Sequence, residues 1–169
     1  NRKFKKTEMV ETLRLALENI DDDICFSYSD IVYDKKLIKA LLKKKIKKNI
    51  ILPINLNWKN TWNIRKKPIL IDAESLILKN NFVIEIGKKI ENPRDVHGQF
   101  MGILLIPRLL RKKLLQKLKN KIFEKYQTTK LLNNLILDNF KIEALKSKYH
   151  WYEFDDYDDL TNYKKEFKI

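Results

Sequence analysis

Apolar residues recur along the chain at helical spacing in some segments and as short uninterrupted runs in others. Residues 7–19 carry apolar side chains at every fourth position, which predicts an amphipathic helix with Thr7 as its N-cap. The uninterrupted apolar runs over 24–29 and 49–54 predict two strands that are buried on both faces. A helix over 35–47 connects them, and this order of elements predicts a parallel pair with a right-handed crossover.

The rest of the chain continues the alternation of strands and helices. Two apolar runs, 75–79 and 82–86, flank Asn80-Asn81, which is typical of a tight hairpin. Residues 99–106 read as a further strand, and Pro107 opens a long helix because proline is tolerated in a first turn. The remaining predicted elements are a helix over 129–138, strands over 142–147 and 151–154, and a helix over 157–167. The pattern predicts a single α/β domain over residues 1–169, with a mixed, mainly parallel sheet and helices on both faces.

Composition narrows the classes of protein to which the chain can belong. Its 169 residues are enough for one ordinary domain, and its apolar runs are too short to cross a bilayer. A single cysteine, Cys25, excludes an internal disulfide bond and a zinc site built from cysteines. Three glycines, Gly87, Gly98 and Gly102, leave no glycine-rich loop of the kind that cradles phosphates. Since the sequence starts at Asn1 rather than at Met, we expect it to be a piece of something longer.

The chain is strongly basic, with 36 Lys and Arg against 22 Asp and Glu and a formal net charge of +14. The densest basic runs, 43–48 and 111–125, lie on predicted amphipathic helices, where solvated polar faces are the favoured interpretation. No zinc-finger spacing or aromatic RNA-binding pattern supports specific recognition of nucleic acid. We therefore expect only weak, sequence-independent binding to nucleic acid at low salt.

Carboxylates stand at the ends of two predicted strands. Asp30 follows the run 24–29, and Asp155 follows the strand over 151–154, on the same strand face as Glu153. A carboxylate at that place points into the crevice where open α/β sheets bind ligands, although a turn or capping role for Asp30 is an equally good interpretation. Two converging carboxylates would suit Mg²⁺, which takes few protein ligands beside substrate phosphates.

Other side chains could contact a substrate, although a structural role is the more common outcome for each. Lys88 follows a strand and could reach a phosphate, but a solvent-exposed lysine is the favoured interpretation. Tyr28, Trp58 and Trp151 could stack on a base, a sugar or a quaternary ammonium group, although buried packing is more frequent.

Five segments of the chain together resemble the sugar-phosphate and phosphocholine nucleotidyltransferases. They are TEMVETLRLALENIDDDICFSYSDIVYDK, EIGKKI, DVHGQFMGILLIP, TTKLLNNLI and WYEFDDYDDLTNY, and they follow one another in the family's order. Each string is weak alone, but the combination is specific and covers nearly the whole chain. The resemblance is closest to the phosphocholine cytidylyltransferase-like branch.

The resemblance implies a Rossmann-like, glycosyltransferase-A-like fold and a reaction. A nucleotidyl group passes from an NTP, with CTP or UTP favoured, to a phosphorylated small molecule such as phosphocholine or a sugar phosphate, and pyrophosphate leaves. Asp30 and Asp155 would hold a catalytic Mg²⁺, Lys88 would approach the acceptor phosphate, and Gln99 and Glu153 would contact the acceptor. We expect a cytoplasmic enzyme of nucleotide-sugar biosynthesis without a transmembrane segment, and a homo-oligomer is left open.

One part of the family's pattern is missing. Members begin with a glycine-rich strand–loop–helix that grips the nucleotide through Arg and Lys, and nothing in this sequence corresponds to it. We therefore expect the chain to be the C-terminal two-thirds of a nucleotidyltransferase domain, N-terminally incomplete and a poor enzyme alone. The alternative is a non-catalytic basic binding module that keeps the fold.

Overall fold

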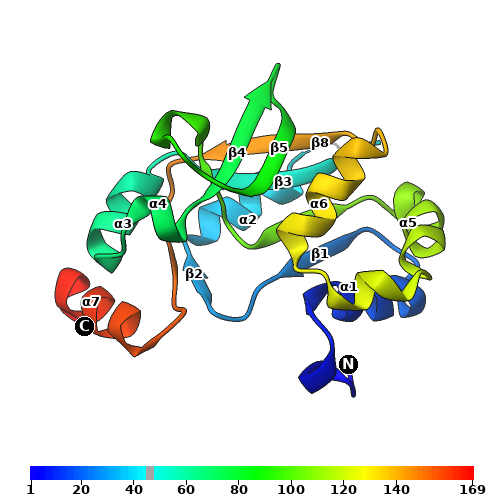
Figure 1. The fold of residues 1–169 in the computed structure, drawn as a ribbon, viewed down its shortest axis with the longest axis horizontal. Helices are drawn as coiled ribbons and strands as arrows, with labels where there is room; N and C mark the ends of the chain where they lie inside the picture. The colour runs from blue at the N-terminus through cyan, green and yellow to red at the C-terminus, as the bar shows by residue number, and fades with distance from the viewer. Residues whose placement is uncertain (45–47) are drawn as a thin grey trace.

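The computed structural model describes residues 1–44 and 48–169, and in it helices cover both faces of a central sheet (Figure 1). The helices are α1 (Met9–Asn19), α2 (Lys35–Leu42), α3 (Trp58–Arg65), α4 (Ile69–Asp72), α5 (Arg111–Leu118), α6 (Thr128–Leu137) and α7 (Tyr157–Phe167). The strands are β1 (Ile24–Ser27), β2 (Ile31–Tyr33), β3 (Ile50–Asn55), β4 (Glu74–Lys79), β5 (Phe82–Lys89), β6 (Gln99–Phe100), β7 (Ile103–Ile106), β8 (Ile142–Ser147) and β9 (Trp151–Glu153). Residues 45–47 of the predicted helix over 35–47 lie outside the described residues.

The large sheet is mixed, as predicted, with the order β1-β7-β3-β8-β5-β4 and with β6 beside β3. Strands β1, β3, β8 and β4 run in one direction, but among the described pairs only β3 and β8 are parallel neighbours. The prediction that the strands over 24–29 and 49–54 pair directly is wrong, because β7 lies between them and is antiparallel to both. All four residues of β7 are buried, which fits its position between two other strands, where both of its faces are covered.

Strand β1 forms an edge of the sheet, and the prediction that it is buried on both faces is wrong. Ile24 is buried in the core with α1, whereas Cys25 and Ser27 are exposed. An uninterrupted apolar run is therefore compatible with an edge strand that has one covered face.

Side chains of the inner strands alternate between two apolar cores. Ile50, Leu52 and Ile54 of β3 pack with α1, α5 and α6, while Ile51 packs with α2 and α3 on the opposite face. The same alternation holds for β7. Helices on both faces are thus confirmed, and the period of two along the buried strands explains how each face obtains its core.

Several local elements differ from the predictions. Helix α3, which the polar and aromatic run over 55–67 concealed, was not predicted. The strand over 99–106 divides into β6 and β7 at Gly102, where φ is +71°. The helix predicted from Pro107 is interrupted, with 3₁₀ turns on either side of α5. The N-cap of α1 is Glu8 rather than Thr7, whose hydroxyl instead donates to the Lys3 carbonyl.

The strands β2 and β9 form a separate antiparallel ribbon that carries the two predicted carboxylates. Ile31 pairs with Glu153, and the backbone N–H of Phe154 donates to the Asp30 carbonyl at 2.9 Å. Asp30 therefore lies opposite the residue that precedes Asp155. The chain folding of this ribbon brings together two positions that are more than a hundred residues apart in the sequence.

Candidate functional site

A pocket of about 370 Å³ lies where the β2–β9 ribbon, the end of α3 and the start of α6 meet. Its lining residues fall into two groups that differ in chemistry. We call one the charged wall, made of Arg65, Asp72, Glu153 and Asp155. We call the other the neutral wall, because most of its side chains carry no charge: it consists of Met9, Tyr28, Trp62, Glu74, Gln99, Phe100, Gln127 and Thr129.

The charged wall is organised around the guanidinium of Arg65, whose side chain is 1% exposed. Its Nε and Nη2 each lie 3.1 Å from an oxygen of Asp159, and Nη2 also donates to Oδ2 of Asp155. Nη1 lies 3.6 Å from Asp72 and 3.9 Å from Glu153. A buried arginine of this kind is stable only when anions surround it, and here they come from three different segments.

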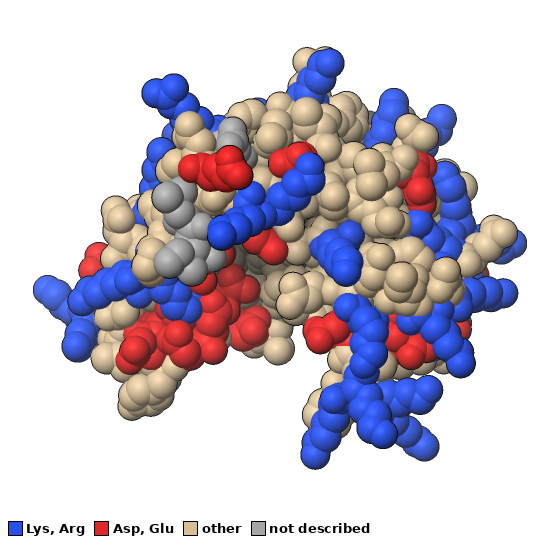
Figure 2. Space-filling view, in the orientation of Figure 1, with Lys and Arg blue, Asp and Glu red and all other residues tan. Residues whose placement is uncertain are grey.

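Lys67 adds a second cation to the same cluster. The left-handed conformation of Lys66, with φ 60°, ends α3 and turns the chain so that Lys67 reaches the same carboxylates. Its Nζ lies 3.1 Å from Asp155 and 2.8 Å from Asp159. Figure 2 shows a group of acidic side chains at the lower left, near α7, on a face where most of the other charged side chains are basic.

The neutral wall is held by hydrogen bonds and close packing. The amide of Gln99 donates to the Glu74 carbonyl at 2.9 Å, and the hydroxyl of Thr129 lies 3.3 Å from the Glu74 carboxylate. The ring of Tyr28 packs edge-on against Phe100, with ring centroids 5.7 Å apart. These side chains present an aromatic surface and a few polar groups to the pocket.

Burial and charge shift the pKa of several groups in and behind the pocket. Burial, with a further contribution from the negative charge of Asp155, raises the pKa of Glu153 to about 7. Burial also raises the pKa of Glu74 and that of the Tyr28 hydroxyl. For Asp159, burial acts in the same direction, but the hydrogen bonds from Arg65 and Lys67 prevail and lower its pKa. The pocket therefore contains carboxyl groups that differ in their readiness to hold a proton.

Four of the predicted site residues line this pocket: Tyr28, Gln99, Glu153 and Asp155. Asp30 is exposed and lies beside them, through the hydrogen bond between its carbonyl and Phe154. Among positions chosen from the sequence, these five are the ones that the fold gathers around one cavity.

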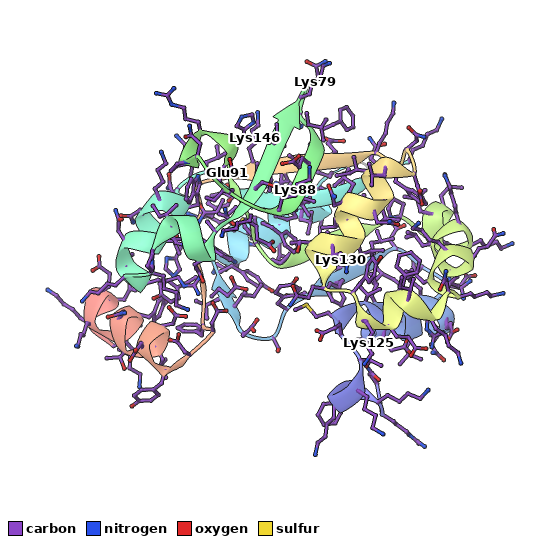
Figure 3. The ribbon with its side chains drawn as sticks, in the orientation of Figure 1. Lys79, Lys88, Glu91, Lys125, Lys130 and Lys146 are labelled. Atoms are coloured by element: carbon purple, nitrogen blue, oxygen red, sulfur yellow. The ribbon has the colours of Figure 1, made fainter. Side chains whose placement is uncertain are left out.

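Lys88, Trp58 and Trp151 do not line the pocket. Lys88 is exposed and forms an ion pair with Glu85, and Figure 3 shows it on the β4–β5 hairpin. Trp58 and Trp151 are each 3% exposed, and they pack in the apolar core with α2. Because their rings are enclosed there, the structure gives no support to the prediction that they stack on a substrate.

The sequence interpretation missed the residues that build the walls. Arg65, Asp72, Glu74 and Thr129 were not selected as candidates, although all four line the pocket. One signal was present: Trp58, Trp62 and Arg65 are spaced so that they share one face of a helix. An arginine on a face with two tryptophans is a candidate for a buried cation.

The pocket region has oxygen donors suited to a divalent metal ion. Within the described residues 1–44 and 48–169, no three or more His, Cys, Asp or Glu side chains are arranged as a metal site. Asp30 and Asp155 nevertheless fit Mg²⁺, because this ion commonly binds one or two protein carboxylates beside water and substrate phosphates.

Two solved structures share the fold of this chain. The chain superposes on the inositol-1-phosphate CTP transferase from T. maritima with a TM-score of 0.71 and 14% identity over 94% of its length. It superposes on an apo UDP-glucose pyrophosphorylase with a TM-score of 0.64 and 12% identity over 98% of its length. At these identities the likeness establishes the nucleotidyltransferase-type fold.

Comparison of sequences finds a relative among characterised enzymes. The chain is 29% identical over 177 aligned positions to the CTP:phosphoglutamine cytidylyltransferase of Campylobacter jejuni subsp. jejuni serotype O:2, which covers 95% of the chain. No protein-family profile matches it. The predicted resemblance to the sugar-phosphate and phosphocholine nucleotidyltransferases is confirmed by this relative together with the fold.

The chain corresponds to part of each of these proteins. It spans 68% of the length of the Campylobacter relative, and 60% and 62% of the two solved structures. Across the described residues, every helix is too short or too polar to cross a membrane.

Proposed function

We propose that the intact protein carrying this chain transfers a nucleotidyl group from CTP or UTP to a phosphorylated small molecule and releases pyrophosphate. An oxygen of the acceptor phosphate attacks the α-phosphorus of the NTP, and the bond from that phosphorus to the β-phosphate bridging oxygen breaks. The observation that supports the proposal is the pocket beside the β2–β9 ribbon, which Gln99, Glu153 and Asp155 line, in a chain similar to a CTP:phosphoglutamine cytidylyltransferase.

The pocket's own side chains would bind and orient the acceptor. Gln99 and Glu153 offer an amide and a carboxyl group to the pocket, while Tyr28 supplies an aromatic surface. Holding two anionic reactants in line accounts for much of the acceleration of a phosphoryl-type transfer. Lys88 remains a candidate for the acceptor phosphate only if the hairpin and the substrate approach one another, since it lies outside the pocket.

Asp30 and Asp155 would hold Mg²⁺, which neutralises phosphate charge when bound. Asp155 contacts Arg65 and Lys67 through its Oδ2 atom, so its carboxylate is already oriented by protein groups. A place in cytoplasmic nucleotide-sugar biosynthesis is part of the same proposal.

The proposal is tested by ³¹P NMR of the intact protein with Mg²⁺, CTP or UTP, and a panel of phosphorylated acceptors. The panel contains phosphocholine, phosphoglutamine, inositol 1-phosphate and glucose 1-phosphate. New diphosphate resonances, with an equal amount of pyrophosphate, are expected for at least one pair. If no pair reacts while the folded protein binds nucleic acid tightly at physiological salt, the function is that of a basic binding module.

A further inference from the structure

Among the described residues, Arg65 is the most buried cation. Its two main carboxylate partners, Asp159 and Asp155, differ in burial and in the number of contacts that they accept from it. Asp159, which is fully buried, accepts from Nε and Nη2 of Arg65, from Lys67, and from the backbone N–H of Asp155 at 2.9 Å. Asp155 is 45% exposed and receives Arg65 at one oxygen. Asp159 therefore anchors the arginine, and the arginine in turn reaches the pocket wall.

The contacts on Asp155 act on a single atom. Nη2 of Arg65 and Nζ of Lys67 both approach Oδ2. Two cations on Oδ2 restrain the position of that oxygen and so limit the directions in which the other oxygen, Oδ1, can point. A planar guanidinium with several donors fixes such geometry better than a single ammonium group does.

Arg65 also joins elements that are far apart in the sequence. It ends α3, and its partners lie at the end of α4, beside β9 and in the first turn of α7. The Tyr152 hydroxyl donates to the Asp159 carbonyl at 3.1 Å, which ties the ribbon to the same point. The position of Asp155 thus depends on a contact made from the end of α3, 90 positions earlier in the sequence.

We propose that Arg65 is a positioning residue for nucleotidyl transfer: anchored by Asp159, it holds the Asp155 carboxylate in the orientation that the reaction and its metal ion require. The inference rests on the proposed function. It assigns a role in the reaction to an arginine that never needs to touch the substrate. Lysine at position 65 keeps the charge but has one ammonium group in place of Nε and Nη2, which contact both oxygens of Asp159 while Nη2 also donates to Asp155. Charge alone therefore does not suffice.

The test compares Arg65→Lys with Arg14→Lys in the intact protein. Arg14 is a matched control, because it makes a two-point ion pair with Glu11 on α1, outside the pocket. For Arg65→Lys we expect kcat about 10- to 100-fold lower and Mn²⁺ affinity, measured by electron paramagnetic resonance, about tenfold weaker. Arg14→Lys is expected to change neither quantity.

A crystal structure of Arg65→Lys adds a readout that is independent of activity. We expect a displaced or disordered Asp155 carboxylate on an otherwise unchanged fold. If Arg65→Lys does not fold, Asp159→Asn is used, since it weakens the anchor while keeping the shape of the side chain. The inference would be overturned if these variants kept the wild-type kcat, the wild-type Mn²⁺ affinity and the wild-type position of the Asp155 carboxylate. If the wild-type protein transfers no nucleotide at all, the proposed function fails, and the structural comparison still decides whether Arg65 positions Asp155.

Discussion

The two walls of the pocket are held in place by different forces. On the charged wall, Arg65 and Lys67 contact carboxylates from separate segments, and removal of one partner leaves a buried charge uncompensated. On the neutral wall, Thr129, Gln99 and Tyr28 are held by packing and by hydrogen bonds in which most partners are uncharged. The charged wall is therefore sensitive to the loss of a single charge, whereas the neutral wall is more sensitive to changes in side-chain volume.

The largest effect is expected when the buried cation is removed from the charged wall. Arg65→Met leaves Asp159 without its main partner, and breaking a buried ion pair in this way costs about 3–5 kcal/mol. Urea denaturation at pH 7 measures the loss. Lys44→Met is the control, because its ion pair with Glu143 is partly exposed and such pairs contribute about 0–1 kcal/mol. Equal effects at the two positions would show that the cluster does not stabilise the fold.

The next effect depends on pH and concerns Glu153. A pKa raised to about 7 means that the folded state holds a proton which the unfolded state releases at its ordinary pKa. The free energy of unfolding therefore falls as pH rises from about 4.5 to about 7, and the loss is complete above that range.

Glu153→Gln removes this titration. We expect the variant to be more stable than the wild type by about 2–3 kcal/mol at pH 8 and equally stable at pH 4. Denaturation curves of both proteins at the two pH values measure the difference. A constant difference at both pH values would contradict the account, because it would mean that Glu153 does not titrate in this window.

The smallest of the stability effects is expected on the neutral wall. Gly87 has φ +80°, and a Cβ there would lie 2.8 Å from Cβ of Thr129. Gly87→Ala should therefore cost about 1–2 kcal/mol through backbone strain and the displaced α6 terminus. Thermal denaturation measures it against Ile84→Val, an exposed position on the same strand. Unchanged stability would show that β5 and α6 adjust freely.

The sequence pointed to residues on both walls, Tyr28 and Gln99 on the neutral wall and Glu153 and Asp155 on the charged wall, but not to the arginine that organises the charged wall. Glu153 and Asp155 were selected from their place at the end of a predicted strand, which is a local property of the chain, and Gln99 was selected from the family resemblance. Arg65 and Asp159 are partners separated by 94 positions, and the pattern around α3 was polar enough to conceal a helix. Contacts of this range depend on tertiary packing, which periodicity does not encode.

The order of the strands was unpredictable for a related reason. The runs over 24–29 and 49–54 were correctly read as strands, but β7, which follows much later in the chain, lies between them. The prediction assumed that consecutive strands pair. Strand β7 consists only of apolar residues, all of them buried, and a central place in the sheet covers both of its faces. The hairpin at Asn80-Asn81 was predictable because both residues adopt positive φ, which asparagine tolerates.

The net charge of the chain is opposite in sign to most of the charged side chains that line the pocket. The net charge of +14 suggests nucleic acid as a partner, yet the pocket is lined by Asp72, Glu74, Glu153 and Asp155 with Arg65 among them. Weak, sequence-independent binding to nucleic acid at low salt stays a prediction. Net charge describes the solvated surface, and the chemistry of a site depends on the few residues that the fold brings together.

The central claim is that the charged wall carries the reaction, and two aspartates three positions apart test it most directly. Asp155 lines the pocket, whereas Asp158 is exposed in the first turn of α7. The measurement is kcat for pyrophosphate release by the intact protein carrying Asp155→Asn or Asp158→Asn, with the acceptor found by ³¹P NMR. The account predicts a loss of about 100-fold or more for Asp155→Asn and wild-type turnover for Asp158→Asn. Equal turnover in both variants would contradict it.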